Sequence, residues 1–303
     1  MEFLRLLEKM RFPLLDKIML LVTELGSMAL FLIVAVVLFW CIDKKKGYYF
    51  IVLGLGGTVI NQFLKLWYRI PRPWVLDEGF TIVEAAREGA GGYSFPSGHT
   101  QSAVSTYLGV ALLTKQRWLK ITAIIISVLV PFTRMYLGVH TPKDVLVAAL
   151  IAIGLVFLLK PLILDCGGRF MPYVLACFTL LSAGFLCFSY LYAFPADVNL
   201  ELLESGRENA LSLFGAVLGL FAVYVLDKKW LEFETKAVWW VQIFKVVFGL
   251  IFLLLVKEVL KAPLNFLFGE GFGRVIRYFF VVISAGALWP MTFHWFGKLG
   301  SGE

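Results

Sequence analysis

Apolar segments long enough to cross a membrane recur from one end of this chain to the other. A spanning helix needs about 20 mostly apolar residues. The chain has 303 residues, of which 60% are hydrophobic and 16% charged, and its mean hydropathy is +0.83. A composition this apolar needs lipid as its solvent, so we predict an all-α, polytopic membrane protein. The predicted spans are residues 22–42, 48–66, 98–114, 120–138, 143–162, 171–193, 209–226, 240–259 and 275–296.

The segment before the first predicted span, residues 1–21, has a different pattern. Its start, MEFLRLLEKMRF, alternates charged residues with leucine and phenylalanine. This pattern predicts an amphipathic helix in the membrane interface, and we predict no cleavable signal peptide. Residues 13–25 are a candidate second interfacial helix, so the number of spans could differ from nine by one.

The charged residues between the apolar segments indicate an orientation. The net charge is +7, but the basic residues form short clusters, not one tract that would indicate nucleic-acid binding. With the Asp43–Lys46 loop in the cytoplasm, the loops on that side, 160–169 among them, carry more Lys and Arg than Asp and Glu. Cytoplasmic loops are typically enriched in Lys and Arg. We therefore predict the N-terminus outside and the C-terminus inside, and the short loops favour a bacterial cytoplasmic membrane.

Three polar clusters interrupt the apolar segments in the first half of the chain. In the predicted topology all three emerge at the outer face of the membrane. They are Lys65-x6-Arg72-Pro73, closing the second span; Pro96-Ser97-Gly98-His99, opening the third; and Arg134-x5-His140-x3-Asp144, between the fourth and the fifth.

The side chains of these clusters suit phosphate chemistry. Guanidinium and ammonium groups bind phosphate oxygens, and the N-terminus of a helix beginning at Gly98 favours an anion. Two histidines can take different roles: one attacks phosphorus as the nucleophile, and the other protonates the leaving oxygen as the general acid. Fixed cations can supply the charge that magnesium supplies in a kinase. The sequence predicts no metal site and no cofactor.

At these residues the chain resembles the type 2 phosphatidic acid phosphatase (PAP2) superfamily, most closely its membrane-bound lipid phosphatase branch. The resemblance covers about residues 13–165 and rests on three motifs in the expected order. It implies a six-helix catalytic core, shared with the vanadium haloperoxidases, which we assign to residues 22–195. Residues 196–303 then form about three additional transmembrane helices whose role is open.

The resemblance also implies the role of each motif residue. His140 would be the nucleophile that forms a phosphohistidine, Asp144 would orient it, and His99 would be the general acid. Thr133 stands where the family often has serine. The replacement keeps a hydroxyl group at this position. The implied phosphate-binding residues are Lys65, Arg72, Ser97, Gly98 and Arg134.

Single residues of the motifs also have purely structural interpretations. Ser97 is a favourable N-cap, and Thr141-Pro142-Lys143-Asp144 is a good helix start in its own right. Lys65 and Arg72 could anchor the chain to lipid headgroups. The combination of all these residues in one pattern favours the catalytic interpretation.

The substrate is less constrained by the sequence. A site at the membrane face favours a lipid phosphate or an isoprenyl diphosphate, bound among membrane lipids. The loop 78–95, through Glu84, Arg87 and Tyr93, and the segment 197–208 are the predicted substrate-selecting regions. Two alternatives stay open: a soluble sugar phosphate, because residues 72–77 resemble glucose-6-phosphatase, and a lipid transporter or binding protein with a degenerate site.

Overall fold

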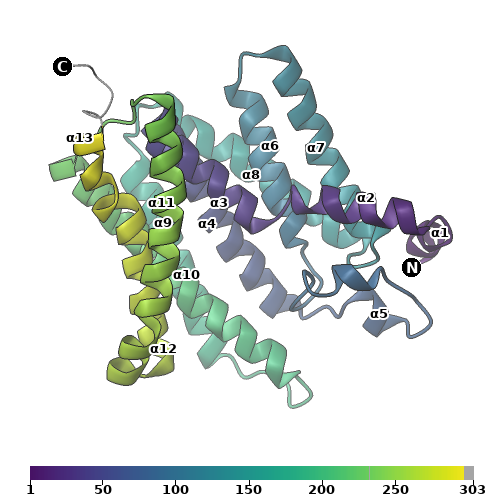
Figure 1. The fold of residues 1–303 in the computed structure, drawn as a ribbon. Helices are drawn as coiled ribbons and strands as arrows, with labels where there is room; N and C mark the ends of the chain where they lie inside the picture. The colour runs from purple at the N-terminus through teal and green to yellow at the C-terminus, as the bar shows by residue number, and fades with distance from the viewer. Residues whose placement is uncertain (232, 297–303) are drawn as a thin grey trace. The chain divides into compact units, whose positions relative to one another are not determined.

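The computed structural model describes residues 1–231 and 233–296, and every regular element among them is helical. This confirms the predicted all-α class (Figure 1). The elements are α1 (Glu2–Lys9), α2 (Pro13–Glu24), α3 (Met28–Val37), η1 (Leu38–Ile42), α4 (Lys44–Tyr68), α5 (Pro73–Leu76), η2 (Glu84–Ala86), α6 (Gly98–Leu113), α7 (Arg117–Tyr136), α8 (Pro142–Lys160), η3 (Pro161–Asp165), α9 (Met171–Leu191), α10 (Leu200–Leu226), η4 (Asp227–Leu231), α11 (Trp239–Val259), α12 (Lys261–Ile283), η5 (Ser284–Leu288), η6 (Pro290–Thr292) and α13 (Phe293–Phe296).

Eight helical segments in the described part of the chain are long and apolar enough to cross a membrane. They correspond to eight of the nine predicted spans. The ninth, predicted at 98–114, is α6, which has only 16 residues. At 1.5 Å per residue such a helix is shorter than a hydrocarbon core of about 30 Å, so length alone does not identify it as a span.

The first apolar segment also differs from the prediction. The candidate span runs from Pro13 to Ile42 and contains α2, α3 and η1. The boundary predicted between residues 21 and 22 therefore falls inside α2. The start of α2 agrees with the candidate helix at residues 13–25, and Pro13 stands at its first position, where a proline fits without losing a hydrogen bond.

The chain forms two compact units, each built from separate stretches of sequence. The first unit comprises residues 1–34, 60–160 and 199–206. In this unit α6 packs against α7 and α8, and α2 packs against α7 (Figure 1). The three polar clusters predicted from the sequence all lie in this unit.

Two helices of the first unit begin with the caps expected from their sequences. At α6 the hydroxyl oxygen of Ser97 accepts a hydrogen bond from the backbone N–H of Thr100, at 3.4 Å. At α8 the Thr141 hydroxyl accepts from the N–H of Asp144 at 3.3 Å, and Asp144 accepts from the N–H of Thr141 at 2.7 Å. The two bonds at α8 are reciprocal and the cap of α6 is a single bond; both caps satisfy N–H groups of the first turn and mark where each helix starts.

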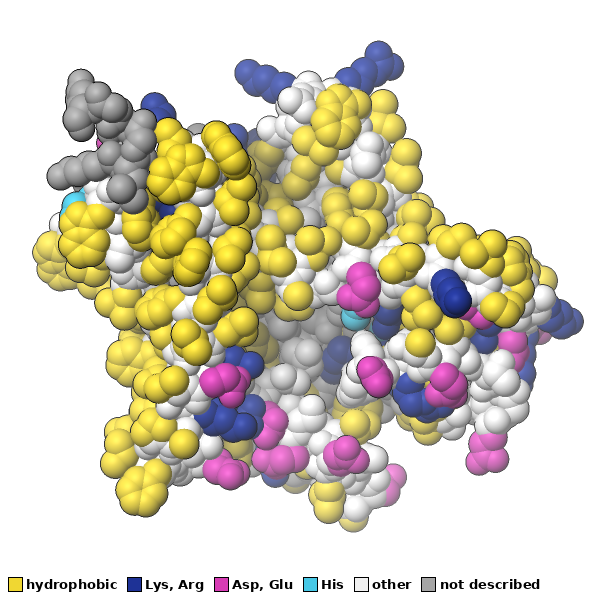
Figure 2. Space-filling view, in the orientation of Figure 1, with side chains coloured by type: hydrophobic (Ala, Val, Ile, Leu, Met, Phe, Trp, Pro, Cys, Tyr) yellow, Lys and Arg dark blue, Asp and Glu magenta, His cyan; other side chains and the backbone are white. Residues whose placement is uncertain are grey.

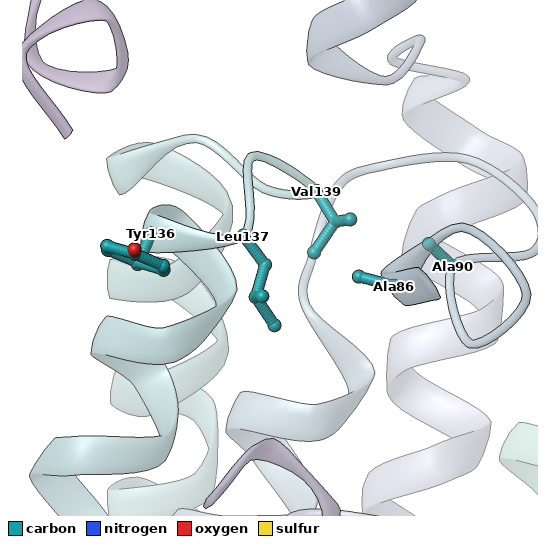
Figure 3. Packing of buried hydrophobic residues seen from close by; sticks show 5 residues of the cluster. All are labelled: Ala86, Ala90, Tyr136, Leu137 and Val139. Atoms are coloured by element: carbon teal, nitrogen blue, oxygen red, sulfur yellow. The ribbon is translucent and has the colours of Figure 1, made fainter. Parts of the chain in front are cut away.

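A small apolar cluster supports the loop that precedes α6. Ala86 and Ala90 of this loop form one buried cluster with Tyr136, the last residue of α7, and with Leu137 and Val139 of the turn that follows, and Figure 3 shows Leu137 and Val139 between Tyr136 and the two alanines. Their packing holds the loop against the turn between α7 and α8. That turn contains one of the two motif histidines.

The second unit comprises residues 35–59, 161–198 and 207–303, of which 232 and 297–303 lie outside the described part. Here α11 packs against α12, and the indole N–H of Trp40 donates to the carbonyl of Ala285 at 2.8 Å. Asp227 is buried and accepts from Lys44 Nζ at 2.7 Å and from the hydroxyl of Tyr48 at 3.1 Å. This buried charge is therefore paired, as a carboxylate in such surroundings has to be.

The helix flanks are covered by hydrophobic side chains that a water-soluble protein would bury. Leu150 and Phe157 of α8, Leu180 of α9 and Leu254 of α11 are more than half exposed. Figure 2 shows hydrophobic side chains along the visible helix flanks, with charged groups concentrated elsewhere on the same face. Exposed apolar surface of this extent indicates contact with lipid.

Gly138 provides a test of the turn between α7 and α8. Its φ is +82°, and a Cβ there would lie 3.0 Å from the ring of Phe80. We expect Gly138→Ala to destabilise the protein by about 1–2 kcal/mol, because a side chain is strained at positive φ. The measurement is the thermal unfolding midpoint in detergent. As a control, Gly184→Ala in α9, where nothing lies within 4 Å of the added Cβ, should leave the midpoint unchanged or raise it. Equal midpoints for the two variants would contradict the expectation.

Candidate active site

His140 lies in the turn between α7 and α8 and is almost completely buried, with 2% of its surface exposed. Its Nε2 is 2.9 Å from Nη1 of Arg72, and its Nδ1 is 3.6 Å from Oδ2 of Asp144. A guanidinium can only donate, so Nε2 must accept with its lone pair and the proton must lie on Nδ1. The ring is therefore neutral, and the nitrogen that carries the lone pair faces the buried cations.

Asp144 lies in the first turn of α8 and has two partners besides His140. Its Oδ2 accepts from the hydroxyl of Ser94 at 2.6 Å and from the N–H of Thr141 at 2.7 Å. The carboxylate thus caps the helix and lies beside the imidazole at the same time. The capping interpretation and the orienting interpretation of Asp144 are compatible in this geometry.

Arg72 and Lys65 are held by backbone carbonyl groups. Arg72 is 6% exposed and donates to the carbonyls of Gly91, Gly92 and Val139 at 2.8, 3.1 and 2.9 Å. Lys65 is 8% exposed and donates to the carbonyl of Tyr93. Because neutral carbonyls position both cations, neither charge is cancelled by a carboxylate of its own.

Arg134 is the most deeply buried of the three cations, with 1% exposed. Its Nη1 donates to the hydroxyl of Thr23 at 2.9 Å. Its Nε and Nη2 are buried without a hydrogen-bond partner among the described residues. A buried donor without an acceptor is unfavourable, so these two N–H groups are available to a ligand.

The N-terminus of α6 contributes the remaining motif residues. Ser97 is buried, and Gly98 and His99 are half-buried at the start of the helix. The N–H of Ser97 donates to the carbonyl of Asp144 at 3.1 Å, which connects this helix start to that of α8. The partial positive charge of the helix N-terminus adds to the field of the cations.

The charges of the site do not balance. Lys65, Arg72 and Arg134 carry three positive charges, and Asp144 is the one acid that accompanies them in the described motif residues. Burial and then the charges of Arg72, Arg134 and Lys65 lower the pKa of His140 well below its usual value. The site as built favours a bound anion with about two negative charges, which is the charge of a phosphate monoester near neutral pH.

No three His, Cys, Asp or Glu side chains of the described part come together in a way that could hold a metal ion.

The predicted substrate-selecting residues divide into two groups. Glu84 and Arg87 pair with each other, Nε to Oε2 at 2.7 Å, and both are largely exposed. Tyr93 is instead buried, and its carbonyl holds Lys65. The structure thus connects Tyr93 to Lys65, one of the predicted phosphate-binding cations, and leaves Glu84 and Arg87 at the surface of the same loop.

Two residues of the site were not predicted from the sequence. Ser94 donates to Asp144 and lies 3.5 Å from His140 Nδ1, and Thr23 accepts from Arg134. Ser94 stands two residues before the motif Pro96-Ser97-Gly98-His99, so its position in the sequence could have indicated that it belongs to the site. Thr23 belongs to α2, 111 residues before Arg134, and nothing in its local sequence connects it with the motifs.

The apolar helices and the buried, cation-rich cluster define an integral membrane protein with an anion site. Residues 45–167 match the family model described as "PAP2 superfamily", and residues 211–301 match "PAP2 superfamily phosphatase, transmembrane extension". The chain is 34% identical to the undecaprenyl-diphosphatase BcrC of Bacillus subtilis over 146 residues, 48% of this chain and 72% of that protein. It is 29% identical to phosphatidylglycerophosphatase B of the same organism, over 50% of this chain and 76% of that protein.

A solved structure, that of Aquifex aeolicus LpxE, is 30% identical with a TM-score of 0.45, covering 52% of this chain and 92% of that one. The chain belongs to the PAP2 superfamily and is a phosphatase of this family. The additional helices predicted at 196–303 overlap the family's transmembrane extension.

The lowered pKa of His140 can be measured directly, because the chain contains three histidines. In protein labelled at histidine, we expect the His140 ring signal to remain that of a neutral imidazole down to pH values below 6.5, the usual pKa. His140→Gln assigns the signal. The unfolded chain binds this proton at a higher pH than the folded chain, so His140 should make folding less favourable as the pH falls below 6.5. A titration at or above 6.5 would contradict the expected direction.

Proposed function

We propose that this phosphatase hydrolyses a lipid phosphate or isoprenyl diphosphate at the extracytoplasmic face of the membrane. The reaction would be metal-independent and would pass through a phosphohistidine on His140. One observation supports this most strongly: three buried cations surround a neutral, buried histidine with a single carboxylate beside it. Such a site is unfavourable when empty of anions and favourable when it holds a phosphate.

Phosphate binding would use the donors that the buried residues leave available. The free Nε and Nη2 of Arg134 match two phosphate oxygens. Arg72, which contacts His140, and Lys65, whose charge acts on the same ring, would share the others. The N–H of Gly98 and the hydroxyl of Ser97 would complete the cradle at the start of α6. If Nη1 of Arg72 donated to a phosphate oxygen instead of to Nε2 of His140, the lone pair of Nε2 would be free to attack phosphorus.

The chemical step then needs two histidines and one carboxylate. Nε2 of His140 attacks phosphorus, the bond to the leaving oxygen breaks, and His99 donates a proton to that oxygen. Burial and then the charges of Arg134, Arg72 and Lys65 lower the pKa of His99 to about 3, so His99 would hold this proton only beside the negatively charged substrate, which offsets those cations. Asp144 stabilises the positive charge that the His140 ring acquires, through the proton on Nδ1. In the second step His99 takes a proton from water as the water attacks phosphorus, so that phosphate leaves and both histidines return to their starting states.

The substrate class follows from the membrane setting and from the relatives. BcrC is an undecaprenyl-diphosphatase and another relative is a phosphatidylglycerophosphatase, so both act on phosphorylated lipids. We propose an isoprenyl diphosphate as the first substrate to test and phosphatidylglycerophosphate as the second. Glu84, Arg87 and Tyr93 in the loop 78–95, with the segment 197–208, are proposed to select among them.

The test is phosphate release by the purified protein in detergent with EDTA present. The panel contains undecaprenyl diphosphate, phosphatidylglycerophosphate, phosphatidate and glucose 6-phosphate. We expect turnover of at least one lipid, and a loss of at least about 10³-fold in His140→Ala, because removal of a nucleophile leaves only binding and electrostatic catalysis. His294→Ala, which removes an exposed histidine of α13, is the matched control and should keep the wild-type rate.

Three results would overturn parts of the proposal. Turnover that disappears with EDTA would reject the metal-independent mechanism. Turnover that survives His140→Ala would reject the phosphohistidine. A preference for glucose 6-phosphate over every lipid would reject the proposed substrate class.

The proposed orientation has its own test. Cys166 lies between η3 and α9 and is exposed, in the loop predicted to face the cytoplasm. Glu88→Cys places a thiol in the loop predicted to face outside. In intact cells a membrane-impermeant maleimide should label Glu88→Cys, made in a variant with all four native cysteines replaced, and should label Cys166 only after the membrane is opened. The reverse labelling pattern would place the site on the cytoplasmic side.

A further inference from the structure

The guanidinium of Arg134 is fixed by a residue outside the three motifs. Thr23, in the last turn of α2, is 3% exposed, and its hydroxyl accepts from Nη1 of Arg134 at 2.9 Å. The two nitrogens without a partner in the described part of the chain, Nε and Nη2, form one edge of the planar guanidinium. An arginine edge with two parallel N–H groups is the geometry that binds two phosphate oxygens.

The contact with Thr23 therefore decides which edge of Arg134 is free. If Nη1 had no acceptor, the guanidinium could rotate about its long side chain, and any pair of its nitrogens could point at a ligand. With Nη1 bound, rotation breaks a hydrogen bond to a charged group in a buried place, which is costly. The hydroxyl of Thr23 thus pre-orients the Nε–Nη2 edge.

Thr23 belongs to a segment that we define as the N-terminal strap, residues 2–24. Contacts of this segment with the rest of the unit hold Thr23 in place. In α2, Asp16 accepts from the hydroxyl of Tyr136 at 2.7 Å. Just before α2, Arg11 donates to the carbonyl of Tyr136 at 2.9 Å and to that of Thr81 at 2.7 Å. Tyr136 is two residues beyond Arg134 on α7, so the strap is bound to the helix whose arginine it orients.

The start of the strap is bound to the loop that follows α5. Arg5 donates to both carboxylate oxygens of Asp77 at 2.8 Å and to the carbonyl of Gly79 at 2.8 Å. Glu8 accepts from the N–H of Thr81 at 2.9 Å. The strap therefore has polar contacts along its whole length, at α1, at the segment before α2 and at both ends of α2.

We infer that Thr23 is a positioning residue for phosphate binding by Arg134, and that the N-terminal strap is a working part of the active site. The inference rests on the proposed function, because it assigns to Arg134 a phosphate ligand. It adds a residue that belongs to none of the three motifs.

The test compares Thr23→Val, which keeps the shape and removes the hydroxyl, with Thr23→Ser, which keeps the hydroxyl. On the lipid phosphate that the wild-type protein hydrolyses, we expect kcat/KM of Thr23→Val to fall about tenfold to a hundredfold, the usual effect of losing a hydrogen bond to a charged group. Thr23→Ser should keep most of the wild-type rate. Thr179→Val is the matched control, because among the described residues the hydroxyl of Thr179 bonds only within α9, to the carbonyl of Leu175 at 2.8 Å.

A double-mutant cycle separates positioning from a general loss of stability. In an Arg134→Ala background, Thr23→Val should cause no further decrease in kcat/KM, because the group it orients is absent. An equal decrease in both backgrounds would show that Thr23 acts independently of Arg134 and would overturn the inference.

Binding of inorganic phosphate provides a readout that does not need turnover. By calorimetry in detergent, we expect weaker binding to Thr23→Val, and binding close to wild type for Thr23→Ser and Thr179→Val. If the wild-type protein binds phosphate but hydrolyses none of the lipids, the proposed function fails while the inference is still tested. If Thr23→Val binds phosphate and turns over lipid like the wild type, the inference fails while the proposed function stands.

Discussion

The burial of three cations around one histidine is the constraint on which the rest of the site depends. Lys65, Arg72 and Arg134 are each less than a tenth exposed, and a buried charge is tolerated only when other groups compensate for its lost hydration. Most of that compensation comes from uncharged acceptors: the carbonyls of the loop before α6 and the hydroxyl of Thr23. Neutral acceptors hold the cations in position without cancelling their charge, and so the positive field stays available to an anion.

The same field explains the state of the histidine. A neutral His140 beside three cations keeps its lone pair, because protonation would add a fourth positive charge to a buried cluster. In the proposed reaction Asp144 has to act against this field when the ring of His140 becomes charged. Its Oδ2 already accepts from Ser94 and Thr141, so its position is fixed before His140 needs it. A fixed carboxylate needs little reorganisation when charge develops, which is the general advantage of a preorganised site.

Much of the fold follows from local sequence. The apolar segments predicted eight of the helices that could cross a membrane, and the caps at Ser97 and at Thr141–Asp144 form as their residue types indicate. The short helix α6 was predicted as a span from its hydropathy, whereas its length is set by the Ser97 cap at one end and by the extended backbone of Thr114 at the other. Hydropathy measures composition and is insensitive to a few residues of length. The division into residues 22–195 and 196–303 stays a prediction.

The candidate site was predictable where its chemistry is carried by side chains in short motifs, and not where it depends on contacts between distant segments. A motif identifies Arg134 as a cation, but the direction of its free edge depends on Thr23, on a helix far away in sequence. The carbonyls that hold Lys65 and Arg72 have no sequence signal, because every residue has a carbonyl. The motifs therefore specify which side chains form the candidate site. The tertiary contacts of the N-terminal strap and of the loop before α6 determine how those side chains are oriented.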